Sequence, residues 1–268
     1  MKLRSWLCAS PLKEKLVEKC ETYSADVIHF DLEDAVPPGK KAIARAGLKA
    51  AFPPQHPLPV AVRINRLATL EGLRDVLFLT EFRLLPTIII LPKAQLARDV
   101  SLVSAIFPDS SIFAVIETLD SYFELRQLSV APAGLAGIIF GAADFAVEMA
   151  LDPLRAAQQL RPIKAEICLN ARRLGLRAID SPCFFPHQQA LLQSEIVQAR
   201  KQGFSGKIAI HPAQIGPINQ GFTTNETCRA RARRVMSMLD KVPGITTDAQ
   251  AMLGPPHLRY ARHILAQK

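Results

Sequence analysis

Short apolar runs alternate with segments of helical periodicity along most of the chain. The apolar runs are rich in β-branched residues, as β-strands are, and they lie at Leu3–Ala9, Val27–Leu32, Val60–Ile64, Thr87–Leu91, Ile112–Ile116, Gly137–Phe140, Leu176–Ile179 and Lys207–Ile210. Between them, the spacing of apolar residues predicts helices at 13–20, 40–51, 70–79, 96–106, 120–128, 161–174 and 188–202. Strands that alternate with helices of this length indicate βαβ units and a parallel sheet. Eight such units favour an α/β fold of the (β/α)8 TIM-barrel type over a doubly wound sheet.

The chain length fits one barrel followed by a short extension. The 268 residues are close to the ~250 of a typical barrel. We assign 1–222 to a catalytic barrel domain and 223–268 to a C-terminal helical extension, with helices at 226–241 and 256–266. Pro243-Gly244 and Gly254-Pro255-Pro256 interrupt this tail, which we expect to act as a cap or an oligomer arm.

Charge and composition narrow the possible partners. Lys and Arg number 33 against 24 Asp and Glu, which gives a net charge of +9 and points to an anionic partner. Aromatic residues make up only 6% of the chain and the basic residues are dispersed, so we expect no nucleic-acid partner. No window has the ~18 consecutive apolar residues of a membrane span. The five cysteines form no CxxC pair, which argues against disulfides or a zinc site and favours a reducing, cytoplasmic location.

Charged and polar residues stand where the predicted strands end. In a TIM barrel the carboxyl ends of the strands meet at one mouth, where the active site lies. The residues that the pattern places there are Asp31, Glu33, Asp34, Arg63, Asn65, Lys93, Glu117, Asp144, Asp180 and His211.

Two of the acidic residues are candidate metal ligands. Glu117 and Asp144 follow adjacent strands, and paired carboxylates suit Mg²⁺ or Mn²⁺, with water and substrate completing the coordination. The alternative is that each carboxylate caps the helix that follows it. Two acidic residues at consecutive strand ends favour the metal site.

The basic residues at the strand ends have two interpretations each. Arg63 could grip a substrate carboxylate with two N–H groups, or it could form an ion pair with Glu33 or Asp34. Lys93 could contact a phosphate or carboxylate, or be solvated or structural, and the solvated or structural interpretation is slightly favoured. For His211 a structural hydrogen bond is favoured.

An ordered set of motifs resembles a known family. The motifs are Asp31-Leu32-Glu33-Asp34-Ala35-Val36, Arg63-Ile64-Asn65, Leu91-Pro92-Lys93, Ile116-Glu117-Thr118, Phe140-Gly141-Ala142-Ala143-Asp144, Ala178-Ile179-Asp180 and Ala209-Ile210-His211-Pro212-Ala213-Gln214-Ile215. In this order they resemble the citrate lyase beta-subunit-like branch of the HpcH/HpaI aldolase/citrate lyase family. The resemblance extends from about Arg4 to Asn219, with a weaker similarity in 256–265.

The resemblance implies a TIM barrel, usually trimeric, that acts on CoA thioesters with Mg²⁺. It implies that Glu117 and Asp144 hold the metal and that Arg63 binds the carboxylate end of the substrate. Glu33 and Asp34 would line the same pocket as catalytic residues. Arg4 and Lys93 complete the substrate-binding set that we expect.

The chain departs from the family pattern at a position before the last helix. Many relatives place an aspartate there, in a Met-apolar-Asp sequence, whereas here Met252-Leu253 is followed by Gly254. Condensation or thioester hydrolysis needs a base that glycine cannot supply. Cleavage depends less on a dedicated base, because water or a strand-end carboxylate such as Glu33, Asp34 or Asp180 could accept the hydroxyl proton. We therefore expect lyase activity to exceed thioesterase activity.

Together these features predict a carbon–carbon lyase. The expected substrate is a 3-hydroxy-3-carboxylic acyl-CoA, such as citramalyl-CoA, citryl-CoA or malyl-CoA, and the products are acetyl-CoA and a keto acid. The alternatives are an aldolase that acts on a free keto acid and a non-catalytic subunit that binds CoA esters. We expect a homo-oligomer, with a trimer favoured.

Overall fold

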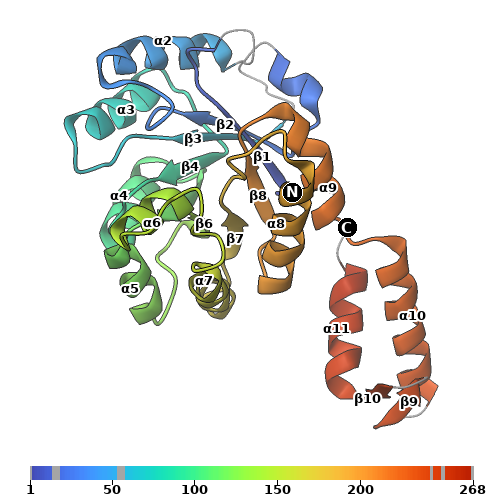
Figure 1. Ribbon diagram of the computed structural model, residues 1–268. Coiled ribbons are helices and arrows are strands. Elements are labelled where there is room, and N and C mark those ends of the chain that lie inside the picture. The colour runs from blue at the N-terminus through green and yellow to red at the C-terminus, as the bar shows by residue number, and fades with distance from the viewer. Residues whose placement is uncertain (1, 14–18, 53–57, 242–243, 249–250, 267–268) are drawn as a thin grey trace. The chain divides into compact units, whose positions relative to one another are not determined.

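Eight parallel strands close into a barrel in the computed structural model, which describes residues 2–13, 19–52, 58–241, 244–248 and 251–266. The strands follow one another around the ring in chain order, and β1 closes it by pairing with both β2 and β8. Their bounds are β1 Ser5–Ala9, β2 Val27–Asp31, β3 Val60–Arg63, β4 Ile88–Leu91, β5 Ser111–Ile116, β6 Leu135–Phe140, β7 Arg177–Asp180 and β8 Gly206–Ala209. The predicted TIM barrel is confirmed (Figure 1).

Helices cover the outside of this ring (Figure 1). The α-helices of this part are α2 Lys41–Ala51, α3 Leu70–Glu81, α4 Leu96–Ile106, α5 Leu119–Gln127, α6 Ala142–Glu148, α7 Arg161–Arg173, α8 Gln189–Gln202 and α9 Ile215–Phe222. Short 3-10 helices lie at η1 Cys20–Tyr23, η2 Pro38–Lys40 and η3 Pro212–Gln214. Most of the helix predicted at 13–20 falls on 14–18, outside the described residues. The pattern missed α6 and α9, because each is too short to show a helical period.

The barrel wall is buried on both faces. One apolar cluster fills the inside of the ring and includes Trp6, Val27, Phe113, Ile139 and Ile208. The rings of Trp6 and Phe113 pack with centroids 5.0 Å apart. A second and larger cluster joins the outer face of the strands to the helices. With the interior filled by side chains, polar groups gather at the carboxyl ends of the strands.

The chain divides into two compact units, Met1–Phe222 and Thr223–Lys268. The second unit consists of α10 Glu226–Lys241, a two-stranded antiparallel sheet of β9 Thr246–Asp248 and β10 Ala251–Leu253, and α11 Pro255–Ala266. It has a small apolar core of its own: Ala232, Val235, Leu239, Leu253, Ala261 and Ile264. The two helices correspond to those predicted, whereas the sheet was not predicted. None of the described helices of the chain is long and apolar enough to cross a membrane.

Candidate active site

Arg63 and Asp31 form a bidentate ion pair at the barrel mouth. They are register partners at the ends of β3 and β2. Arg63 Nε donates to Asp31 Oδ1 at 2.8 Å, and Nη2 donates to Oδ2 at 2.6 Å. Burial opposes the ionisation of Asp31, but the guanidinium outweighs it and lowers the pKa of this carboxyl to about 2. Asp31, rather than the predicted Glu33 or Asp34, is therefore the main partner of Arg63.

Glu33 and Asp34, the predicted partners of Arg63, contact the third nitrogen of its guanidinium, Nη1. Arg63 Nη1 lies 3.0 Å from Glu33 Oε2 and 3.5 Å from Asp34 Oδ2. Asp31 also accepts the backbone N–H of Glu33, at 2.8 Å, and so fixes the start of this loop. The structure shows ion pairs of Arg63, while its grip on a substrate carboxylate stays a prediction. One edge of its fork is held by Asp31, and the other edge faces Glu33 and Asp34.

Lys93 connects this pair to the candidate metal ligands. Its Nζ lies 3.0 Å from Glu33 Oε1 and 3.7 Å from Asp144 Oδ1. Its backbone N–H donates to Glu117 Oε1 at 2.9 Å. Lys93 has a φ of 49°, in the left-handed region, and this conformation costs energy for a residue other than glycine. The contacts of Lys93 agree with a structural role, and its side chain is 27% exposed. Its contact with a substrate stays a prediction.

Glu117 is buried beside Lys93, directly after β5, with an exposed fraction of 2%. Burial raises the pKa of its carboxyl to about 8, and the neighbouring Glu33 carboxylate adds to the effect. Gly141 allows the end of β6 to approach it, because a Cβ at Gly141 would lie 2.4 Å from Glu117 Cβ and 2.8 Å from Oε2. Any larger residue at 141 would displace the Glu117 side chain.

Asp144 lies in the first turn of α6, after the end of β6, and is partly exposed. Lys93 thus contacts both Asp144 and Glu117, and brings together the two residues predicted to share a metal. The donor chemistry fits a hard divalent cation, because both side chains offer carboxylate oxygens, and a cation would offset the effect of burial and of Glu33 on the ionisation of Glu117. Within the described residues no group of three or more His, Cys, Asp or Glu side chains is arranged as a metal site. Two carboxylates would leave positions for water and substrate, as Mg²⁺ sites commonly do.

Arg4 does not lie at this mouth, and its predicted role in substrate binding is corrected. It directly precedes β1, at the amino end of the strand, whereas Arg63 ends β3. Its Nε and Nη2 each lie 2.7 Å from a carboxylate oxygen of Asp26, which directly precedes β2. The pair therefore joins the first two strands at the opposite end of the barrel.

The predicted position of Asp180 at the barrel mouth is also wrong. It ends β7 but is fully buried on the outer face of the wall, where it pairs with Lys164 at 2.6 Å and Lys207 at 2.8 Å. Neighbouring residues of a strand point to opposite faces, and Ile179 belongs to the interior cluster. Asp180 therefore cannot accept a proton at the mouth.

His211 and Asn65 have structural contacts. Nδ1 of His211 accepts the backbone N–H of Ala213 at 3.2 Å, which agrees with the favoured interpretation. Asn65 donates from Nδ2 to Asp75 at 2.7 Å and to the Leu32 carbonyl at 3.0 Å.

Two polar residues below the mouth were not predicted. His29 lies two residues before Asp31 on β2, and neither of its ring nitrogens has a hydrogen-bond partner among the described residues. Burial lowers the pKa of His29 to about 4, so the ring is neutral at physiological pH. Cys8 is its register partner on β1, and burial raises the pKa of that thiol to about 12. The two-residue spacing of His29 and Asp31 in a strand was the available signal.

The chain is similar to known protein families. The family model described as HpcH/HpaI aldolase/citrate lyase matches residues 4–212. The chain belongs to this family. A second model, described as a C–C bond lyase of the TIM-barrel fold, matches residues 160–268. The resemblance seen in the motifs is confirmed, and the protein is an enzyme of the carbon–carbon lyase class.

Several relatives of this HpcH/HpaI family member carry functional names. The chain is 31% identical to a (3S)-malyl-CoA thioesterase of Cereibacter sphaeroides, over 98% of this chain and 94% of that protein. It is 29% identical to an L-malyl-CoA/beta-methylmalyl-CoA lyase of the same species, over 84% of this chain and 80% of the relative.

Solved structures of similar proteins share the fold. The crystal structure of RipC from Yersinia pestis has a TM-score of 0.73 and 34% identity, over 84% of this chain and 96% of that one. CitE from Mycobacterium tuberculosis, in complex with magnesium, acetoacetate and coenzyme A, has a TM-score of 0.85 and 27% identity, over 98% of this chain and 96% of that one.

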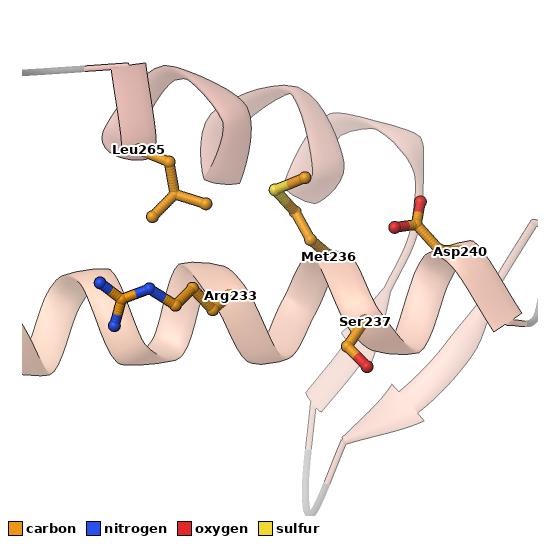
Figure 2. Close-up of a pocket in the computed structure, with 5 residues that line it drawn as sticks. All are labelled: Arg233, Met236, Ser237, Asp240 and Leu265. Carbon is orange, nitrogen blue, oxygen red and sulfur yellow. The ribbon is translucent and has the colours of Figure 1, made fainter.

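The C-terminal unit of this family member has a pocket of about 440 Å³ between α10 and α11. It is lined by Arg233, Met236, Ser237, Asp240 and Leu265, which Figure 2 shows as sticks. None of the predicted site residues belongs to it. The arginine-rich stretch of α10 forms ion pairs within this unit, Arg233 with Glu226 and Arg234 with Asp248.

Gly254 directly precedes α11 in the same unit. Its carbonyl accepts the backbone N–H of His257 at 2.9 Å, and a Cβ at this position would meet its nearest atoms at 3.7 Å. A side chain therefore fits at 254, and the absence of an aspartate there is not imposed by space.

Proposed function

We propose that the protein is a Mg²⁺-dependent lyase that cleaves a 3-hydroxy-3-carboxylic acyl-CoA to acetyl-CoA and a keto acid. Citramalyl-CoA, citryl-CoA and malyl-CoA are the candidate substrates. The observation that carries the proposal is the placement of Glu117 and Asp144 around Lys93, next to the Arg63 guanidinium. The malyl-CoA lyase among the relatives, and the magnesium and coenzyme A bound by CitE, support it.

Glu117 and Asp144 would hold the metal. When bound, Mg²⁺ supplies Lewis acidity, which lowers the pKa of the substrate hydroxyl and polarises the carbonyl that forms on cleavage. Glu117 suits this role because its buried carboxylate gains most from a neighbouring cation.

Arg63 would bind the substrate carboxylate. Asp31 fixes the plane of the guanidinium through two hydrogen bonds. The orientation of the other edge, at Nη1, is therefore set before the substrate arrives. The carboxylate would replace Glu33 or Asp34 at Nη1, where the contacts are 3.0 and 3.5 Å.

Glu33 is the better placed proton acceptor of the two acidic residues. Its side chain is mostly buried and burial raises its pKa, whereas Asp34 is 57% exposed. Cleavage of the bond between the hydroxyl carbon and the adjacent methylene turns the hydroxyl into the keto-acid carbonyl. The hydroxyl proton passes to Glu33, and the electron pair leaves as the acetyl-CoA enolate, which the thioester delocalises. Glu33 then returns this proton, directly or through water, to the enolate carbon, so that acetyl-CoA forms, Glu33 is again a carboxylate and the net reaction consumes no proton.

The test is to incubate the purified protein with Mg²⁺ and each of the three acyl-CoA esters and to follow acetyl-CoA by chromatography. We expect Mg²⁺-dependent release from at least one ester, and its loss in Glu117→Gln. Glu81→Gln, which neutralises an exposed glutamate of α3, is the matched control. Cleavage of none of the three esters would overturn the proposal.

Thioester hydrolysis of the same class of substrate is the second candidate, because one relative is named a malyl-CoA thioesterase. We expect acetyl-CoA release to exceed free-CoA release in the wild type, since Gly254 offers no base to activate water. Gly254→Asp should increase free-CoA release, and space exists for its side chain. Strong hydrolysis of malyl-CoA by the wild type would show that another residue supplies the base.

The proposed enzyme is a cytoplasmic homo-oligomer, and a trimer is favoured. Free cysteines at Cys8, Cys168, Cys183 and Cys228 among the described residues support a reducing compartment. Exposed apolar residues of the C-terminal unit, Ile245, Met252 and Tyr260, support its role as an oligomer arm. Light scattering of the full chain tests this assembly, and a monomer at micromolar concentration would contradict it.

A further inference from the structure

Lys93 contacts three carboxylates of the mouth through two different groups. Its ammonium bridges Glu33 and Asp144, at 3.0 and 3.7 Å, while its backbone N–H is bonded to Glu117. The backbone of Lys93, where these contacts meet, is in the left-handed region, with a φ of 49°. Lys93 therefore binds one proposed metal ligand, Glu117, through its backbone N–H and places a positive charge beside the other, Asp144.

The carboxylates of the mouth differ in which cations compensate their charge. Asp31 is compensated by two hydrogen bonds from Arg63, and Glu33 by Arg63 and Lys93 together. For Asp144, the ion pair found among the described residues is the one with Lys93. A divalent cation held by Asp144 would stand within a few ångströms of this ammonium, and their repulsion is only partly screened at a half-buried site.

We infer that the Lys93 ammonium competes with the divalent cation for Asp144, and that it ties metal binding to the arrival of an anionic substrate. The inference rests on the proposed function in taking Glu117 and Asp144 as the metal ligands and a keto acid as a ligand of the same site. A substrate carboxylate gives the ammonium another acceptor besides Glu33, so that it can leave Asp144. Metal then binds weakly to the free enzyme and tightly to the enzyme that holds a carboxylate ligand.

A substitution can separate the two roles of Lys93. Lys93→Met keeps the unbranched stem and the backbone N–H to Glu117 but removes the charge. Lys93→Gln does the same with a polar end, and Lys93→Arg keeps the charge. Lys201→Met is the matched control, because it removes an exposed lysine from the last turn of α8.

The measurement is Mn²⁺ affinity at constant pH and ionic strength, from the electron paramagnetic resonance signal of free Mn²⁺, with and without saturating pyruvate. We expect Lys93→Met and Lys93→Gln to bind Mn²⁺ about tenfold or more tightly without pyruvate, since a repelling unit charge is gone. Pyruvate should tighten Mn²⁺ binding strongly in the wild type, in Lys93→Arg and in Lys201→Met, and less in the two neutral variants, where only its direct ligation of the metal contributes.

Unchanged or weaker Mn²⁺ binding in both neutral variants, with circular dichroism spectra like that of the wild type, would overturn the inference. So would a pyruvate effect of equal size in the wild type and the neutral variants. If the wild type binds no Mn²⁺, or if Glu117→Gln and Asp144→Asn bind it normally, the proposed metal site itself fails. That outcome is distinct from failure of the role of Lys93.

Discussion

Replacement of Arg63 is the sharpest test of the proposed site, because its guanidinium supports both the fold and the substrate. Arg63→Lys keeps the positive charge but cannot form the two parallel bonds of 2.8 and 2.6 Å to Asp31. Arg63→Met removes the charge and leaves Asp31, which is 1% exposed, without its counter-ion.

The structure sets the size of these effects. A charge-assisted hydrogen bond contributes about 1.5–3 kcal/mol to stability, so Arg63→Lys should lower the free energy of unfolding by about that amount. Removing one partner of a buried pair costs about 3–5 kcal/mol, which we expect for Arg63→Met. In a chain of this size each kcal/mol lowers Tm by roughly 2–4 °C. Arg63→Met should therefore lower Tm by roughly 6–20 °C.

The effect on turnover should exceed the effect on stability for the lysine variant. A lysine offers a point charge that does not fix the carboxylate in one orientation, and misplaced substrates react about 100-fold more slowly. Urea unfolding gives the stability, and acetyl-CoA release at saturating Mg²⁺ gives kcat and KM. Asp31→Asn, alone and combined with Arg63→Met, measures the coupling free energy of the pair.

Near-normal kinetics of Arg63→Lys would refute the reasoning and reduce Arg63 to an ion-pair partner of Asp31. A coupling free energy near zero would refute the account of stability.

Three further predictions concern the metal ligands, Gly141 and the dependence of stability on pH. Glu117→Gln and Asp144→Asn should each abolish measurable Mg²⁺ binding by calorimetry; if both variants bind Mg²⁺ normally, the metal site lies elsewhere. Gly141→Ala should cost about 1–3 kcal/mol of unfolding free energy in urea and impair metal binding, because its Cβ would stand 2.4 Å from Glu117 Cβ; a neutral effect would mean that Glu117 can move aside freely. The pKa of Asp31 is lowered from 3.8 to about 2, so the stability that this shift supplies is fully present above pH 3.8 and is lost as pH falls through 2. It amounts to about 2 kcal/mol, and Asp31→Asn should flatten the pH dependence of the urea midpoint between pH 5 and 2; equal slopes for the two proteins would contradict this.

The order and type of the main elements could be predicted from the sequence. Isoleucine-rich runs such as Thr87–Leu91 are typical of strands buried on both faces, and β4 lies there at Ile88–Leu91. The positions of Arg63, Lys93 and Glu117 at strand ends follow directly, because a parallel barrel brings all carboxyl ends to one mouth. The helices α6 and α9 were missed because neither is long enough to display a period.

The direction of each side chain was decided only by the tertiary structure. A strand with two buried faces has no alternation of polar and apolar residues, so its sequence does not say which face points inward. Asp180 followed a strand as Glu117 does, yet it lies outside the wall against Lys207, while Glu117 lies at the mouth. The strand register likewise makes Asp31 the main partner of Arg63, although Glu33 and Asp34 are also carboxylates close by in the sequence.

The sequence by itself determined the strand order, the kind of fold and which polar residues follow each strand, because these depend on local apolar patterns and on short motifs. It could not determine that Lys93 adopts a left-handed conformation and joins Glu33, Glu117 and Asp144, or that Arg4 pairs with Asp26 at the opposite end of the barrel. Those contacts join residues from different strands. They exist only once closure of the barrel has fixed the register of each strand against its neighbours.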